Sequence, residues 1–164
     1  MDKTESRTSL VNSYLAKLNL DDEIQSYFSG RNILVTGGAG AIGSNLVIAL
    51  SELVGDEGMI IVLDNLSAIK GDDPIDFPSI PNVMFVTGDV RNDVDLKRVF
   101  RERPTIIYHL AAFFANQNSV DYPETSADVD INGMIKLLDL AQFTNVERFI
   151  YASRGCAIYG SYGK

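Results

Sequence analysis

The sequence predicts an α/β protein built on a doubly wound parallel sheet of about five strands, preceded by a helical extension. Short apolar runs of strand length alternate with helix-length segments along most of the 164 residues, which is the pattern of parallel α/β folds. The runs are apolar at nearly every position, as expected for strands that are buried on both faces. The intervening segments are long enough to be the crossover helices that parallel strands require.

Residues 1–30 are expected to form the N-terminal helical extension, and residues 31–164 the sheet domain. Apolar side chains recur at three- and four-residue spacings from Leu10 to Phe28, which predicts one or two amphipathic helices over residues 9–29. The simpler role for these helices is to pack on the flank of the domain. A contact between the subunits of a homodimer is the alternative.

The elements of the sheet domain follow in order. Strands are expected over residues 33–35, 59–63, 83–86, 105–110 and 148–152, and helices over residues 44–53 and 92–102 and after Pro123. The long helix after Pro123 is expected to bury Val129, Ile131, Met134, Leu137, Leu138 and Ala141. Between the second and third strands, residues 65–82 form a polar loop with three prolines, and loops of this length are often functional.

A glycine-rich turn joins the first strand to the first helix of the sheet domain. Residues 36–43 read T-G-G-A-G-A-I-G, and two registers fit: G-x-G-x-x-G starting at Gly38 and T-G-x-x-G-x-x-G with its first glycine at Gly37. Glycines at this spacing provide a tight turn, a close approach of the backbone to a ligand, and close packing of the helix on the strand. The helix then offers unpaired N–H groups and the positive end of its dipole. The turn therefore predicts a site for the pyrophosphate of a dinucleotide, in a fold of the Rossmann type.

The second strand ends in Asp64, about 20 residues after the last glycine, where a carboxylate that binds ribose is expected. Asp64 would accept hydrogen bonds from both ribose hydroxyls and would repel a 2′-phosphate. NAD is therefore favoured over NADP, although Lys70 is a nearby cation. The alternative is that Asp64 only initiates a turn before Asn65.

Other polar or small residues follow the remaining strands, at the edge where such sheets bind ligands. Asp89 could accept a hydrogen bond from an adenine amino group while Val90 packs on the ring, or Asp89 could be a solvated turn residue. Ala111 and Ala112 are small enough for a cofactor to lie against the backbone, although helix packing explains them equally well. His109 is interpreted as structural. The set at the strand ends is completed by Asn65, Ser67 and Ser153.

Composition excludes several classes of function. The net charge of −8 disfavours binding to nucleic acid and to anionic membranes. With one cysteine, Cys156, and one histidine, an intrachain disulfide is impossible and no metal site is expected. The chain shows no signal segment and no apolar run of 18 residues, so a cytoplasmic enzyme or binding domain is expected.

Motifs over residues 31–160 resemble the extended short-chain dehydrogenase/reductase family, the NAD-dependent nucleotide-sugar epimerases and dehydratases. UDP-glucose 4-epimerase-like proteins are the most similar branch. The motifs are T-G-G-A-G-A-I-G, L-D-N-L-S at 63–67, G-D-V-R at 88–91, H-L-A-A at 109–112, I-N-G at 131–133 and I-Y-G at 158–160. The resemblance implies that bound NAD takes a hydride from C4 of a sugar nucleotide and returns it. It places around the cofactor Gly37, Gly40, Ala41, Ile42, Gly43, Asp64, Asn65, Ser67, Asp89, Val90, Leu110, Ala111 and Ala112.

The chain also departs from the family pattern. The family's proton acceptor is the tyrosine of a Tyr-x-x-x-Lys motif, and the 164 residues contain no such motif. Ser153 is the one hydroxyl that could take the role of the family's catalytic serine or threonine, and Asp130 stands where relatives commonly carry asparagine. The sequence is therefore expected to be the cofactor-binding part of such an enzyme, without the substrate-binding part and inactive alone. A non-catalytic NAD-binding module and an interaction domain are the alternatives.

Overall fold

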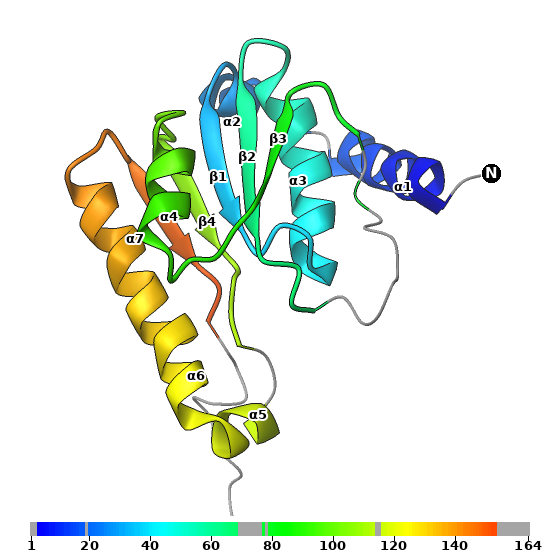
Figure 1. The fold of residues 1–164 in the computed structure, drawn as a ribbon. Coiled ribbons are helices and arrows are strands. Elements are labelled where there is room, and N and C mark those ends of the chain that lie inside the picture. The colour runs from blue at the N-terminus through cyan, green and yellow to red at the C-terminus, as the bar shows by residue number, and fades with distance from the viewer. Residues whose placement is uncertain (1–2, 19, 69–76, 78, 114–115, 154–164) are drawn as a thin grey trace, which may run out of the picture.

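The computed structural model describes residues 3–18, 20–68, 77, 79–113 and 116–153 (Figure 1). Lys70, Cys156 and the I-Y-G motif at 158–160 lie outside the described residues. Two helices precede the sheet, as the sequence predicts. They are α1 (Lys3–Leu18) and α2 (Asp22–Phe28), and α1 begins six residues earlier than the apolar spacing indicates. The Asp21 carboxylate caps α2 by accepting a hydrogen bond from the Ile24 amide at 2.9 Å.

The centre of the fold is a five-stranded sheet in which every neighbouring pair is parallel. Its strands are β1 (Asn32–Thr36), β2 (Met59–Asp64), β3 (Val83–Thr87), β4 (Ile106–His109) and β5 (Arg148–Tyr151), in the order β3-β2-β1-β4-β5. This order confirms the predicted doubly wound sheet. The chain moves outward from β1 to β3 and then returns to the other side, so the strand order reverses between β1 and β4.

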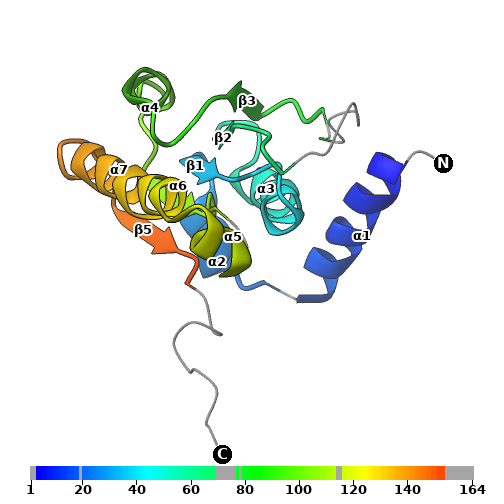
Figure 2. The same ribbon diagram turned by 60° about the horizontal axis from the view of Figure 1, so that its bottom comes forward.

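The crossover helices cover both faces of the sheet (Figures 1 and 2). They are α3 (Ala41–Val54) on one face, and α4 (Asp93–Phe100), α6 (Pro123–Ala127) and α7 (Gly133–Gln142) on the other, with the short helix α5 (Asn116–Asp121) before α6. A π-helical turn, η1 (Asp128–Asn132), joins α6 to α7, so that these three elements form the long helix predicted after Pro123. Helix α5 was not expected from the sequence.

Strand side chains alternate between two separate cores. Leu34, Ile61 and Ile107 face α4 and α7, where Leu96, Val99 and Leu137 pack against them. Ile33, Val35, Ile60 and Val62 face α3, where they meet Val47, Leu50 and Val54. Because β1 to β4 each contribute to both cores, their sequences are continuous apolar runs rather than alternating ones, whereas the edge strand β5 contributes only Phe149.

The prediction for the long helix is wrong at two positions. Val129 and Leu137 are buried, but Ile131 and Leu138 are 54% and 43% exposed. The buried positions Val129, Gly133 and Leu137 lie four residues apart and form one narrow stripe along η1 and α7. Ile131 and Leu138 lie outside this stripe and are therefore exposed.

Candidate functional site

The glycine-rich turn between β1 and α3 lies against the end of β4. Gly37 has a φ of +71°, a backbone conformation that residues other than glycine rarely adopt. A Cβ atom there would lie 2.6 Å from the Ala111 nitrogen and 2.8 Å from the Leu110 carbonyl carbon. Gly37 is therefore required both by its conformation and by the close approach of β4.

Gly43 allows the first turn of α3 to sit directly on the glycine-rich turn. A Cβ atom at Gly43 would lie 2.3 Å from the Gly37 oxygen and 2.6 Å from the Gly38 Cα. These neighbours are backbone atoms, which cannot move aside without changing the turn. Gly43 thus provides the close helix packing that the glycine pattern predicts.

Gly40 differs from the other two, because a Cβ atom there would have a single neighbour within 4 Å. It is the N-cap of α3, with an ordinary φ of −69° and no side-chain cap. A Cβ atom there would meet only the Gly37 oxygen, at 3.3 Å. The first turn of α3 has no acidic residue, and the Ile42 side chain is 73% exposed. The first amides of α3 are thus open to an anionic ligand, which fits the pyrophosphate of a dinucleotide.

Asp64 is fixed at the end of β2 by two backbone amides. Its Oδ2 accepts a hydrogen bond from Ala39 N at 2.9 Å, and its Oδ1 accepts one from Leu66 N at 2.8 Å. Leu66 adopts a left-handed φ of 60° within this turn. A carboxylate has about four lone-pair sites, so half of them remain for ribose hydroxyls. The turn and the ligand thus use the same carboxylate, and the turn-initiating role does not exclude the ribose-binding one.

Asp89 is more heavily occupied than the sequence suggests. Arg91 donates to it through its backbone amide, Nε and Nη2, at 2.8–2.9 Å, and Asn65 Nδ2 donates to it at 2.8 Å. The hydrogen bond from the Arg91 side chain is the main cause that lowers the pKa of Asp89 to about 2. The Asn65 Oδ1 in turn accepts the Ser67 amide at 3.0 Å. These polar residues form a connected wall beside Asp64, in which Arg91 was not anticipated.

Val90 lies in the core rather than on the open side of the crevice. Its side chain is 5% exposed, and a Cβ atom added to Gly133 would lie 2.7 Å from its Cγ2. Only a small part of this side chain is accessible to an adenine ring, so the expected contact between Val90 and the adenine stays a prediction. Gly133, at the start of α7, is the residue that makes this close packing possible.

The ends of β4 and β5 lie at the same edge as the glycine-rich turn. The Leu110 amide bonds to the Thr36 carbonyl at 3.0 Å, Ala111 contacts the turn, and Ala112 is exposed. After β5, the Ala152 amide donates a hydrogen bond to the His109 carbonyl at 3.2 Å. Ser153, the next residue, is exposed. The sheet therefore brings the predicted site residues to one edge, at the point where the strand order reverses.

Comparison with known proteins identifies the family. The family model for NAD dependent epimerases and dehydratases matches residues 33–164. The chain belongs to this family. NAD is the family's cofactor, so the prediction of NAD is confirmed at this level.

Three relatives illustrate the similarity. A UDP-glucose 4-epimerase of Mycolicibacterium smegmatis is 34% identical over 78% of this chain and 40% of its own length. The solved structure of an epimerase from Methanothermobacter thermautotrophicus is 47% identical, with a TM-score of 0.77, over 87% of this chain and 40% of that one. The UDP-glucose 4-epimerase of Thermus thermophilus, solved with NAD, is 36% identical, with a TM-score of 0.67, over 81% and 40% of the two chains. The chain thus spans about two fifths of the length of these family members.

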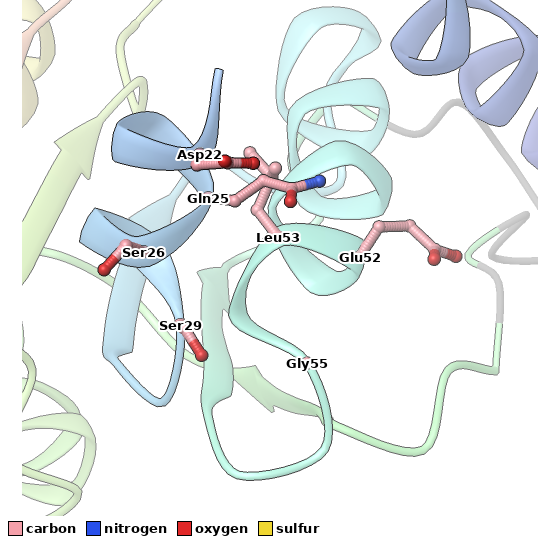
Figure 3. A pocket seen from close by; sticks show the side chains of 7 residues that line it. All are labelled: Asp22, Gln25, Ser26, Ser29, Glu52, Leu53 and Gly55. Carbon is pink, nitrogen blue, oxygen red and sulfur yellow. The ribbon is translucent and has the colours of Figure 1, made fainter. Parts of the chain in front are cut away.

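A separate hollow lies at the opposite end of α3 from the glycine-rich turn (Figure 3). Its volume is ≈ 450 Å³, and it is lined by Asp22, Gln25, Ser26, Ser29, Glu52, Leu53 and Gly55. It lies at the C-terminal end of α3, where the helix dipole disfavours an anionic dinucleotide. Among the described residues, no group of three or more histidine, cysteine, aspartate or glutamate side chains could hold a metal ion. In the same part of the chain, no helix is long and apolar enough to cross a membrane.

Proposed function

We propose that this chain is the NAD-binding portion of a nucleotide-sugar epimerase or dehydratase. The observation that carries the proposal is the open start of α3, where Gly40 leaves the first amides uncovered opposite the Asp64 carboxylate. An anion is stabilised there by the unpaired N–H groups and by the helix dipole, even though the chain carries a net charge of −8. The family membership and the UDP-sugar epimerases among the relatives support the same conclusion.

In this proposal, each part of the crevice has a defined task. The amides of Ala41, Ile42 and Gly43 hold the pyrophosphate, and Asp64 holds the adjacent ribose. Asn65, Ser67 and Asp89 form the wall near the adenine, with the backbone at Val90, and the backbone of residues 110–112 borders the rest of the cofactor. Bound NAD supplies a hydride acceptor and donor for C4 of the sugar. Ser153, exposed beyond β5, is the group of this chain placed to hydrogen-bond the sugar.

The proposal assigns residues 1–30 to an extension and residues 31–164 to the NAD-binding domain. Substrate contacts and the proton acceptor would come from sequence other than these 164 residues, which contain no Tyr-x-x-x-Lys motif. A location in the cytoplasm belongs to the same proposal. A homodimer is also proposed, because Leu10 and Tyr14 on α1 are 69% and 61% exposed and offer apolar surface for a second copy. Sedimentation of wild type and a Leu10→Ser/Tyr14→Ser variant tests the dimer, which only the wild type should form.

Calorimetric titration with NAD+ tests the main proposal. We expect saturable binding of one NAD+ per chain, and no interconversion of UDP-glucose and UDP-galactose by the chain alone. The absence of NAD+ binding by the folded chain would contradict the proposal. NAD+ binding without any activity, even in a chain extended by a family member's remaining sequence, would instead favour the non-catalytic NAD-binding module.

A further inference from the structure

His109 connects the strand before the glycine-rich turn to the strand before Ser153. It is the chain's one histidine, and its side chain is 1% exposed. Its Nδ1 lies 2.7 Å from the Thr36 Oγ1 at the end of β1. On its other side, the ring centroid lies 5.7 Å from that of Tyr151 on β5. A single buried side chain thus contacts both neighbours of β4 where the crevice opens.

The Thr36 hydroxyl extends this connection to the backbone of β4. Thr36 is fully buried, and its Oγ1 accepts a hydrogen bond from the Ala111 amide at 3.3 Å. The Ala111 nitrogen is also the atom that would lie nearest to a Cβ atom added at Gly37, at 2.6 Å. The chain of contacts therefore runs from His109 through Thr36 to the part of β4 on which the glycine-rich turn rests.

Counting donors and acceptors indicates the direction of the bond between Thr36 and His109. A hydroxyl has one hydrogen and two lone pairs, and the Ala111 amide uses one lone pair. If Thr36 donates to Nδ1, every polar group of the pair is satisfied except Nε2, which has no partner in the described part of the chain. If Nδ1 donates instead, the hydroxyl hydrogen of Thr36 also lacks a partner there. The first arrangement buries fewer unsatisfied groups and is favoured.

A neutral imidazole is consistent with this arrangement. Burial is the main cause that lowers the pKa of His109 to about 4, against a smaller opposing effect of the Asp130 carboxylate. The ring therefore carries one hydrogen near neutral pH, and Nδ1 can accept a bond. A charged ring would carry hydrogens on both nitrogens and could not accept the Thr36 hydrogen.

We infer that His109 is a positioning residue of the dinucleotide crevice. With its hydrogen on Nε2, it orients the Thr36 hydroxyl, which holds the Ala111 backbone against the glycine-rich turn. The inference rests on the proposed function in one respect, since it takes this crevice to be the NAD site. It adds a role for two buried residues that would not touch the cofactor themselves.

Nitrogen NMR of the 15N-histidine-labelled protein tests the tautomer directly, because the chain's one imidazole gives an unambiguous spectrum. At pH 7 we expect the proton on Nε2, with Nδ1 showing the shift of a hydrogen-bonded acceptor. In Thr36→Val the Nδ1 shift should move to that of an unbonded acceptor, whereas Thr36→Ser, which keeps the hydroxyl, should retain it. A proton on Nδ1 in the wild-type protein would overturn the inference.

Binding and exchange measurements test the positioning role. Thr36→Val should weaken NAD+ binding about tenfold, the effect of losing one buried hydrogen bond. It should also speed hydrogen exchange at the Ala111 amide, and Thr36→Ser should restore both properties. Ser51→Ala is the matched control, since it removes a buried hydroxyl that bonds only within α3, to the Ile48 carbonyl at 2.8 Å. Equal NAD+ affinity and exchange in Thr36→Val and wild type would refute the inference.

The two proposals fail in different ways. If the wild-type chain does not bind NAD+, the proposed function is contradicted, while the imidazole spectrum and the Ala111 exchange still decide the role of His109. If the wild type binds NAD+ but the Thr36→Val variant binds it equally well, only the inference about His109 fails. If Thr36→Val does not fold, two measurements still decide the role of His109. They are the proton position on the wild-type imidazole and the NAD+ affinity of Thr36→Ser, which should match that of the wild type.

Discussion

The Asp64 carboxylate accepts the backbone amide of Ala39, 25 residues earlier in the chain, at 2.9 Å. This bond ties the end of β2 to the glycine-rich turn after β1. It places a negative charge beside the open start of α3, at the position where a dinucleotide's ribose would lie. The carboxylate that shapes the turn is therefore the one that we propose to bind the ribose.

We predict that the chain binds NAD+ more tightly than NADP+, because Asp64 repels a 2′-phosphate. Asp64→Asn removes the charge but keeps an oxygen that can accept the Ala39 amide. It should narrow the preference by about tenfold, which corresponds to about 1.4 kcal/mol. Calorimetric titration of the wild type and Asp64→Asn with NAD+ and with NADP+ measures the preference. Asp56→Asn, an exposed charge change in the loop after α3, is the control and should leave the preference intact. Equal affinities of the wild type for NAD+ and NADP+ would contradict the assignment of Asp64.

Two glycines of the turn should respond to substitution in opposite ways. Gly40→Val should abolish NAD+ binding and leave the fold intact, because a side chain there would occupy open space in front of α3. Gly43→Ala should instead destabilise the fold by several kcal/mol, because its methyl group would overlap backbone atoms of Gly37 and Gly38. Urea unfolding and NAD+ titration of the two variants separate the effects. A stable Gly43→Ala protein, or a Gly40→Val protein with unchanged affinity, would show that the turn is built differently.

The close packing of Gly133 against Val90 predicts that a smaller residue at position 90 offsets a larger one at position 133. Gly133→Ala should lower the free energy of unfolding by about 1–3 kcal/mol, because the new methyl group overlaps the Val90 Cγ2. In the double variant with Val90→Ala, that overlap disappears, so the two changes should not be additive. A double-mutant cycle measured by urea unfolding checks this. Additive losses would mean that the two residues do not contact each other in solution.

His109 predicts a pH dependence of stability. Burial is the main cause that lowers its folded-state pKa from the ordinary 6.5 to about 4, so the unfolded chain binds the proton more readily. The contribution of His109 is fully present above pH 6.5 and is lost as the pH falls toward 4. Urea unfolding at several pH values between 4 and 7 measures the slope. His109→Gln should show a shallower slope in this window, and an unchanged slope would indicate that His109 is not buried in the neutral form.

The predictions made from the residues alone were most accurate where a local pattern has one physical explanation. The apolar strands, the glycine-rich turn and Asp64 each have such a pattern, and the structure brings the predicted residues to one edge of the sheet. Val90 shows where this reasoning stops. Its position after Asp89 does not reveal that its side chain is 5% exposed and packs against Gly133, which is 43 residues away in the sequence.

The sequence by itself determined the parallel α/β class, the glycine-rich turn and NAD as the family's cofactor, because these depend on periodicity, on glycine conformation and on local motifs. Only the tertiary structure decided which lone pairs are already in use. Asp89 accepts a hydrogen bond from Asn65, 24 residues earlier, and His109 is paired with Thr36, 73 residues earlier. Hydrogen-bond partners across strands depend on register and distance, and neither quantity is encoded in the spacing of residues along one strand.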